Sequence, residues 1–179
     1  MIIKTGTIWI TGLSGSGKTS LGASLVHALE LLGIHNVELL DGDETRKRLP
    51  QTYGYSNEDR KTVGLLVSKL ANECNKRGNI AIVCAISHVK QTRTQIREYL
   101  EPDFMEVYLD CPVEVCADRD IKGHYQKALA GEYENFIGVT EPYQLSAQPE
   151  VILDTVNQSV DQCTDILVQY TLKFFDLDG

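Results

Sequence analysis

A glycine-rich loop between an apolar segment and an amphipathic one constrains the fold of this chain more than any other feature. Residues 12–19 read Gly-Leu-Ser-Gly-Ser-Gly-Lys-Thr, which matches the pattern G-x-x-x-x-G-K-[ST] at every fixed position. The preceding run, 7–11, is β-rich and apolar, and apolar residues recur at helical spacing over 20–32. The order strand, glycine loop, helix is the setting in which this pattern binds phosphate groups.

The residue types of this loop indicate how it binds a nucleotide. Its glycines permit a tight turn and let backbone N–H groups approach phosphate oxygens, while the following helix contributes the positive end of its dipole. Lys18 is predicted to reach the β- and γ-phosphates and to be catalytic, and the Thr19 hydroxyl is predicted to bind Mg²⁺. We assign nucleotide binding to Gly12, Ser14, Gly15, Ser16, Gly17, Lys18, Thr19 and Ser20.

The composition is that of an ordinary globular domain. The chain has 179 residues, 42% of them hydrophobic and 23% charged, so we expect residues 1–179 to form a single domain. The net charge of −8 argues against a general nucleic-acid binder or a partner of anionic membranes. There is no run of about 20 apolar residues and no signal-peptide pattern, and the five irregularly spaced cysteines are typical of reduced thiols. We therefore expect a cytoplasmic protein.

Strand and helix patterns alternate along the chain. Strands are predicted at 7–11, 37–40, 79–86, 104–109 and 151–154, and helices at about 20–32, 58–77, 90–100, 112–117 and 158–171. This alternation indicates a three-layer α/β fold with a five-stranded parallel sheet flanked by helices. Residues 118–148 are too many for an ordinary connection, so we expect them to form a lid or binding element.

Two aspartates follow the second predicted strand. Asp41 and Asp43 stand just past its carboxyl end, and ligands of α/β sheets bind at that edge. Ionised carboxylates accept hydrogen bonds and bind hard cations, so both residues are candidates for holding Mg²⁺ or for taking a proton from a phosphoryl acceptor. We predict catalytic roles for Asp41 and Asp43 and a metal-binding role for Asp41 together with Thr19.

Basic and aromatic residues lie where they can meet anionic ligands. Arg46, Arg48 and Arg60 follow the aspartates, and arginine binds phosphate groups well. The expected lid holds basic side chains that could close over phosphates, interleaved with aromatic rings that could either stack on a base or pack the lid itself. The lid residues in question are Arg119, Lys122, Lys127, Tyr125, Tyr133, Phe136 and Tyr143.

The four histidines carry less information. His88 follows the third predicted strand and is either a site residue or a hydrogen-bonded structural one. We interpret His27, His35 and His124 as structural.

Several longer motifs carry a family resemblance over nearly the whole chain. They are Leu-Asp-Gly-Asp-x-x-Arg at 40–46, Gly-Tyr-Ser-x-Glu-Asp-Arg at 54–60, Asp-Cys-Pro-x-Glu-Val-Cys at 110–116 and, most specific, Arg-Asp-Ile-Lys-Gly-His-Tyr-Gln-Lys-Ala at 119–128. With the glycine loop, these motifs resemble the adenylylsulfate kinase family of P-loop kinases. Those enzymes phosphorylate the ribose 3′-hydroxyl of adenosine 5′-phosphosulfate with ATP and Mg²⁺.

The resemblance implies roles for particular residues. Asp43 would organise metal and acceptor, and Arg119 would lie against the adenine of ATP, with Lys122 in the mobile lid. The acceptor nucleotide would be bound by Asp43, Arg46, Tyr55, Arg60, Ile86, Ser87, Lys127 and Phe136, with the base between Tyr55 and Phe136. The resemblance also implies a homodimer, a small nucleotide acceptor as the partner, and the P-loop kinase fold.

Three departures from the family pattern leave a second hypothesis about the acceptor nucleotide open. Residues 63–66 are Val-Gly-Leu-Leu where the family typically has Asn-Ile-Arg-Arg, residues 88–89 are His-Val in place of Pro-Tyr, and Leu129 replaces an arginine. All three lie on or near the expected acceptor side. The alternative is therefore a kinase of the same fold with a different nucleotide acceptor, for example cytidine diphosphoramidate in capsule modification. A nucleotide-binding module without turnover is disfavoured because Lys18 and both aspartates are present.

Overall fold

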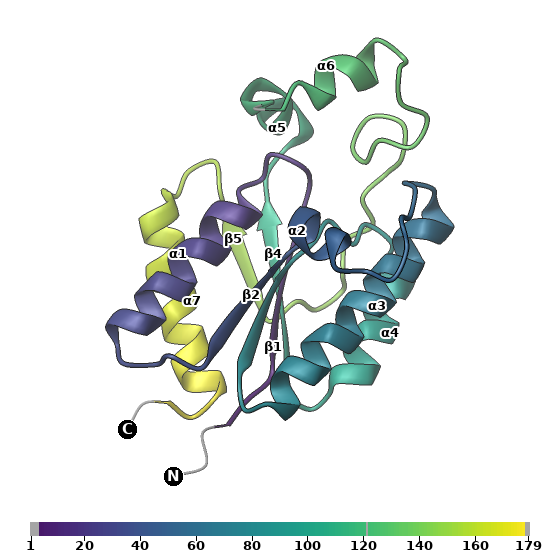
Figure 1. Ribbon diagram of the computed structural model, residues 1–179. Helices are drawn as coiled ribbons and strands as arrows, with labels where there is room; N and C mark the ends of the chain where they lie inside the picture. The colour runs from purple at the N-terminus through teal and green to yellow at the C-terminus, as the bar shows by residue number, and fades with distance from the viewer. Residues whose placement is uncertain (1–3, 121, 178–179) are drawn as a thin grey trace.

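The computed structural model describes residues 4–120 and 122–177, and its centre is a five-stranded parallel sheet (Figure 1). The strand order is β2-β3-β1-β4-β5. The strands are β1 (Thr7–Thr11), β2 (Val37–Asp41), β3 (Ile80–Cys84), β4 (Phe104–Asp110) and β5 (Val151–Asp154). The helices are α1 (Lys18–Leu31), α2 (Gly42–Lys47), α3 (Asn57–Lys76), α4 (Lys90–Leu100), α5 (Val113–Arg119), α6 (His124–Leu129) and α7 (Val160–Phe174). The α/β architecture expected from the sequence is confirmed.

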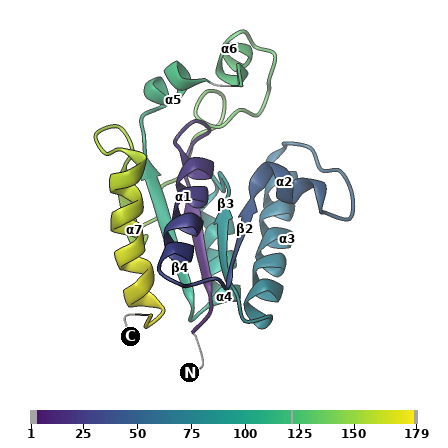
Figure 2. The same ribbon diagram turned by 60° about the vertical axis from the view of Figure 1, so that its left-hand side comes forward.

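Helices cover both faces of the sheet, which makes three layers. α1 and α7 lie on one face, and α3 and α4 lie on the other (Figures 1 and 2). β1 is buried along its whole length, and its alternate side chains enter different cores. Ile8 and Ile10 pack with Leu25 of α1, whereas Trp9 packs with Val67 of α3. Burial on both faces explains the nearly continuous apolar character of the central strands.

The carboxyl ends of all five strands meet at one edge of the sheet because every strand pair is parallel. The loop 12–17, α2 and the segment 118–148 gather at this edge, where α5 and α6 lie beyond the sheet (Figure 1). Among the described residues, no helix has both the length and the apolar character that a membrane crossing requires.

Two short helices were not predicted. α2 starts at Gly42 because the Asp41 carboxylate, at its N-cap, accepts a hydrogen bond from the Asp43 amide at 3.3 Å. α6 lies inside the expected lid, and the Asp120 carboxylate accepts hydrogen bonds from the Tyr125 and Gln126 amides, both at 3.0 Å. Each helix has six residues, too few to show an apolar period.

A network of buried charges joins β4 to the chain that leads into β5. Arg93 of α4 and Glu106 of β4 are almost fully buried and form an ion pair of 3.1 Å. Arg93 also donates hydrogen bonds to the carbonyls of Ser87 and Gln144, and Ser146 donates one to Glu106. These bonds attach the carboxyl end of the segment 118–148 to the sheet.

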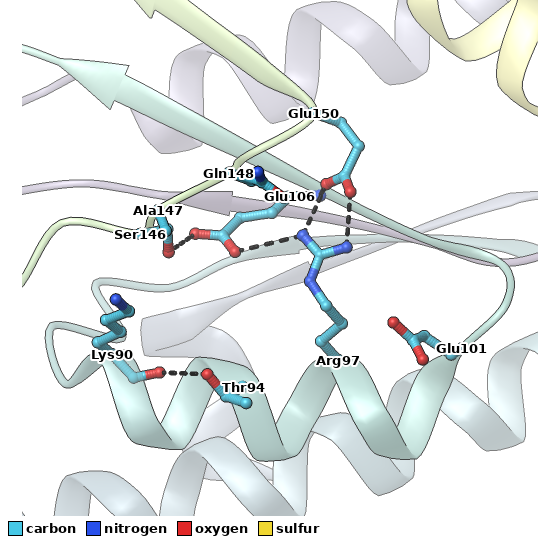
Figure 3. Close-up of a pocket in the computed structure, with 9 residues that line it drawn as sticks. All are labelled: Lys90, Thr94, Arg97, Glu101, Glu106, Ser146, Ala147, Gln148 and Glu150. Carbon is cyan, nitrogen blue, oxygen red and sulfur yellow. Dashed lines mark hydrogen bonds and ion pairs between the residues drawn. The ribbon is translucent and has the colours of Figure 1, made fainter.

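Figure 3 shows a pocket of about 330 Å³ beside this network, between α4 and residues 146–150. Arg97 points from α4 across the pocket to Glu150, and its two Nη atoms make hydrogen bonds of 2.6 and 2.8 Å to that carboxylate. Arg97 also lies 3.6 Å from Glu106, so three charged residues of this pocket, Arg97, Glu106 and Glu150, are paired with one another.

Two glycines in the helices that cover the sheet provide a paired test of packing. A Cβ atom at Gly22 of α1 would lie 2.5 Å from Cys84 Sγ, whereas at Gly64 of α3 it would meet Ile96 Cδ1 at an ordinary 3.4 Å. We expect Gly22→Ala to overpack the core, to destabilise the fold by about 1–3 kcal/mol and to lower Tm by about 2–12 °C. Gly64→Ala should leave Tm unchanged or raise it, because alanine favours helix over glycine by about 1 kcal/mol. Calorimetric melting of both variants checks the prediction, and equal shifts would contradict it.

Candidate active site

The glycine loop connects β1 to α1 and has the backbone that a phosphate-binding loop needs. Gly12 has a φ of 151°, and a Cβ there would lie 2.9 Å from Ser16 Oγ. Gly15 has a φ of 79°, and a Cβ there would lie 2.9 Å from the carbonyl of Cys116. Gly17 forms the N-cap of α1 without a side-chain cap, which leaves the first N–H groups of the helix to bind an anion.

Lys18 lies folded along this loop. Its Nζ donates hydrogen bonds to the carbonyls of Gly12, at 3.0 Å, and Leu13, at 2.6 Å. Removal from water lowers the pKa of the Lys18 ammonium to about 8, since burial disfavours the charged form. The ammonium is thus held at the mouth of the loop, with a proton that it loses more readily than an exposed lysine does.

The Thr19 hydroxyl and the Asp41 carboxylate lie side by side. The Thr19 hydroxyl donates a hydrogen bond of 2.6 Å to Asp41 Oδ2, which joins the start of α1 to the end of β2. In the part of the chain that the structure describes, there is no cluster of three or more His, Cys, Asp or Glu residues suited to a metal. A hydroxyl beside a carboxylate fits Mg²⁺, which takes few protein ligands and keeps waters or substrate phosphates as the others.

Asp43 contacts the segment 118–148. Its Oδ2 accepts a hydrogen bond from Lys122 Nζ, and this bond holds the pKa of the Asp43 carboxyl below its usual range. Both side chains are more than 60% exposed, so the contact can open and close at little cost. Sequence patterns do not show this contact because 79 positions separate the two residues.

The segment 118–148 also packs on the glycine loop. Arg119 donates hydrogen bonds to the carbonyls of Gly15, at 3.2 Å, and Thr155, at 2.6 Å. The Tyr125 hydroxyl donates one of 2.6 Å to the Ser14 carbonyl, and burial raises the pKa of Tyr125. Arg119 therefore lies between the loop and the end of β5.

A second pocket, of about 420 Å³, opens beside Asp43. It is lined by Asp43, Arg46, Lys47, Thr52, Tyr53, Tyr55 and His124. The Arg46 guanidinium lies 4.5 Å from the centre of the Tyr55 ring and donates hydrogen bonds to the carbonyls of Tyr53 and Gly54. The pocket thus combines cations with exposed aromatic surface, which suits an anionic nucleotide.

Arg60 contacts both Tyr55 of this pocket and the segment 118–148. Its guanidinium lies 5.3 Å from the Tyr55 ring and donates hydrogen bonds to the carbonyls of Tyr55 and Asn135. Phe136, beside Asn135, stacks on Tyr133 with ring centres 5.9 Å apart and meets Tyr125 edge-on at 4.9 Å. The Tyr55 and Phe136 rings therefore have different partners in this structure.

Three remaining candidate residues lie apart from this pocket. The Ile86 carbonyl accepts a hydrogen bond of 2.6 Å from Thr11, and Ser87, with a φ of 46°, accepts one of 3.1 Å from the indole of Trp9. Both follow β3 at the carboxyl edge of the sheet. Lys127 is exposed near the end of α6.

The structure distinguishes between the histidines. His88 is buried, and its Nε2 lies 2.8 Å from Asn57 Oδ1. Burial, helped by the charge of Arg60, lowers the pKa of His88 to about 4, so it is neutral at pH 7. His124, which we interpret as structural, has a hydrogen-bond partner in Tyr133 and also lines the second pocket. The sequence signal for a pocket position of His124 is its place two residues after Lys122, in the segment rich in basic and aromatic residues.

Comparison with known proteins identifies the family of this chain. The family model described as adenylylsulphate kinase matches residues 4–154. The chain belongs to the adenylylsulphate kinase family. The adenylyl-sulfate kinase of Synechococcus sp. (strain JA-3-3Ab) is 40% identical over 163 residues, which are 91% of this chain and 92% of that protein. The adenylyl-sulfate kinase of Clostridium acetobutylicum is 40% identical over 167 residues, 93% of this chain and 83% of that protein.

Solved structures of adenylylsulphate kinases have the same fold. The Mycobacterium tuberculosis APS kinase CysC in complex with AMPPNP and APS superposes with a TM-score of 0.89 at 34% identity, over 94% of this chain and 98% of that one. A shikimate kinase from Acinetobacter baumannii, at 21% identity and a TM-score of 0.56, shows the shared kinase fold alone.

The Lys122 contact predicts how Asp43 titrates. We expect Lys122→Met to raise the pKa of the Asp43 carboxyl towards its ordinary value, because the main group that lowers it is removed. Carboxyl NMR titration of the two proteins measures the shift. Lys127→Met, which removes an exposed lysine from the same segment, is the matched control and should leave the Asp43 titration unchanged. An unshifted Asp43 in Lys122→Met would contradict the contact.

Proposed function

We propose that this family member is an ATP-dependent adenylyl-sulfate kinase that phosphorylates the ribose 3′-hydroxyl of adenosine 5′-phosphosulfate to give 3′-phosphoadenylylsulfate. The observation that carries the proposal is the position of Asp43 between the phosphate-binding loop and the cationic, aromatic pocket. A group at that point can meet both a nucleotide phosphate and an acceptor hydroxyl. Support also comes from the relative whose structure holds AMPPNP and APS.

The donor side is proposed to work through the loop. Backbone N–H groups of residues 12–20 bind the phosphates of ATP, and the Lys18 ammonium exchanges its bonds to the Gly12 and Leu13 carbonyls for phosphate oxygens. Arg119 lies where it can pack on the adenine. Thr19 and Asp41 would hold Mg²⁺, which neutralises phosphate charge when bound.

The acceptor side is proposed to centre on Asp43, which accepts the proton of the attacking hydroxyl. Its lowered pKa keeps the carboxyl ionised at neutral pH, so that it can accept a hydrogen bond from that hydroxyl, although the lowering weakens it as a base. Arg46 and Arg60 neutralise the anionic groups of the acceptor, and the base stacks on Tyr55, with Phe136 approaching as the segment closes. Ile86, Ser87 and Lys127 complete the proposed acceptor site.

Residues 118–148 are proposed to act as the lid of a single-domain enzyme, because they contact the loop through Tyr125 and Asp43 through Lys122. Lid closure would exclude water during transfer. The free thiols support a cytoplasmic location, where cysteines stay reduced. We further propose a homodimer. One family neighbour, from Thiobacillus denitrificans, is described as hexameric.

A second candidate is a kinase of the same fold with another nucleotide acceptor, such as cytidine diphosphoramidate. The departures at the acceptor side favour it: Val63 packs into the apolar core with Trp9, His88 pairs with Asn57, and Leu129 is 70% exposed. Val63 and Leu129 lack the polar groups that the family pattern has at those positions, and His88 stands where the pattern has proline.

Turnover of the purified protein on a small acceptor panel decides between the two candidates. ADP release and product mass are measured with ATP–Mg²⁺ and adenylylsulfate, adenosine 5′-monophosphate or cytidine diphosphate derivatives. Adenylylsulfate should give the highest kcat/KM. Faster phosphorylation of a cytidine derivative would establish the second candidate, and turnover by Lys18→Ala equal to that of the wild type would contradict both.

The pKa of Lys18 predicts a pH dependence. Because the pKa of the ammonium is lowered to about 8, the free enzyme loses this positive charge as the pH rises through that value. We expect kcat/KM for ATP to fall above pH 8, approaching tenfold per pH unit. In Lys18→Arg, which stays charged, this inflection should disappear even if the rate is lower. A wild-type profile that stays flat to pH 9.5 would contradict the assignment.

A further inference from the structure

The pocket beside Asp43 is built from two separate parts of the chain. Six of its seven lining residues lie between positions 43 and 55, on α2 and the loop that follows it. The seventh, His124, is the first residue of α6 and belongs to the segment 118–148. In the described part of the chain, His124 is therefore the side chain through which that segment enters the pocket wall.

The orientation of the His124 ring is set by Tyr133. His124 Nδ1 lies 3.1 Å from the Tyr133 hydroxyl, and the two rings are 5.9 Å apart. We assign this hydrogen bond as donated by the Tyr133 hydroxyl to Nδ1, because an imidazole nitrogen accepts better than a phenol oxygen, and the assignment puts the ring proton on Nε2. Tyr133 is itself held by stacking on Phe136.

Nε2 is left as a donor for a ligand. Among the described residues, Nε2 has no hydrogen-bond partner. It is also not one of the buried side-chain atoms without a partner, so a ligand in the pocket can reach it. Arg46 and Lys47 of the same pocket are also donors, and Asp43 is bound by Lys122. A pocket with this set of donors selects a ligand rich in oxygen acceptors, as a nucleotide is.

We propose that His124 determines specificity for the acceptor nucleotide, donating a hydrogen bond from Nε2 to an oxygen atom of the bound acceptor while Tyr133 holds the ring. The proposal rests on the proposed function, since it takes this pocket to be the acceptor site. Because His124 and Lys122 lie on the same segment, the bond to the acceptor forms when the lid meets Asp43.

The test compares two Michaelis constants in the same variants. Wild type, His124→Leu, His124→Gln and Tyr133→Phe are assayed with ATP–Mg²⁺ and adenylylsulfate, and kcat and KM are measured for each substrate. In His124→Leu we expect KM for the acceptor to rise about tenfold, with kcat and KM for ATP within about twofold of wild type. His124→Gln keeps a donor near Nε2 and should recover most of the loss, and Tyr133→Phe should show a smaller rise. His27→Leu, the same change at an exposed position of α1, is the control.

Other outcomes separate the inference from the proposed function. If KM for the acceptor in His124→Leu stays within twofold of wild type, the inference is wrong. If both Michaelis constants rise together, the side chain serves lid packing, which also contacts the ATP loop through Tyr125, and the inference is again wrong. If wild type phosphorylates a different nucleotide from the panel, the proposed substrate fails and the same comparison is made with that nucleotide. A wild type without turnover on any acceptor overturns the proposed function, and the inference with it.

Discussion

The complete burial of β1 is the constraint on which the rest of this structure depends. β1 pairs with β3 on one side and β4 on the other, and its alternate side chains enter cores on opposite faces of the sheet. Its carboxyl end is therefore fixed by neighbours in every direction. The glycine loop begins at that end, so the position of β1 in the centre of the sheet fixes the positions of Lys18 and of the start of α1. Asp41 reaches the same edge at the end of β2, because all five strands run in parallel.

Much of this arrangement could be predicted from the sequence, because the signals are local. The loop motif lies between a strand and a helix, and five apolar runs alternate with helical patterns, so the layers and the donor-side residues follow from short stretches of chain. Helix and strand ends shifted by a few residues, which is expected where capping decides them.

The parts that could not be predicted depend on contacts between distant residues. The first turn of α6 donates hydrogen bonds to the Asp120 carboxylate, Lys122 meets Asp43 across 79 positions, and His124 enters a pocket formed mainly by residues 43–55. No periodicity or motif encodes such distances. Histidines also look alike in a sequence, yet His88 is buried beside Asn57 whereas His124 faces a pocket. Their difference arises from the fold and not from their neighbours in the chain.

The ion pair between Arg93 and Glu106 has a consequence for how this chain can vary. Each side chain is almost fully buried, so each is the main compensation for the charge of the other. Loss of Glu106 leaves Arg93 as a buried charge without its carboxylate, which costs about 3–5 kcal/mol. Loss of Arg93 leaves Glu106 with Arg97 at 3.6 Å, and replacing both by apolar residues of similar volume is often neutral. A single change at Glu106 is therefore disfavoured, although the doubly changed state is accessible. The carbonyls of Ser87 and Gln144, which Arg93 also binds, would lose their shared donor in that double change. Any sequence change that passes through this pair thus alters the loop after β3, at Ser87, and the carboxyl end of the segment 118–148, at Gln144, in the same step.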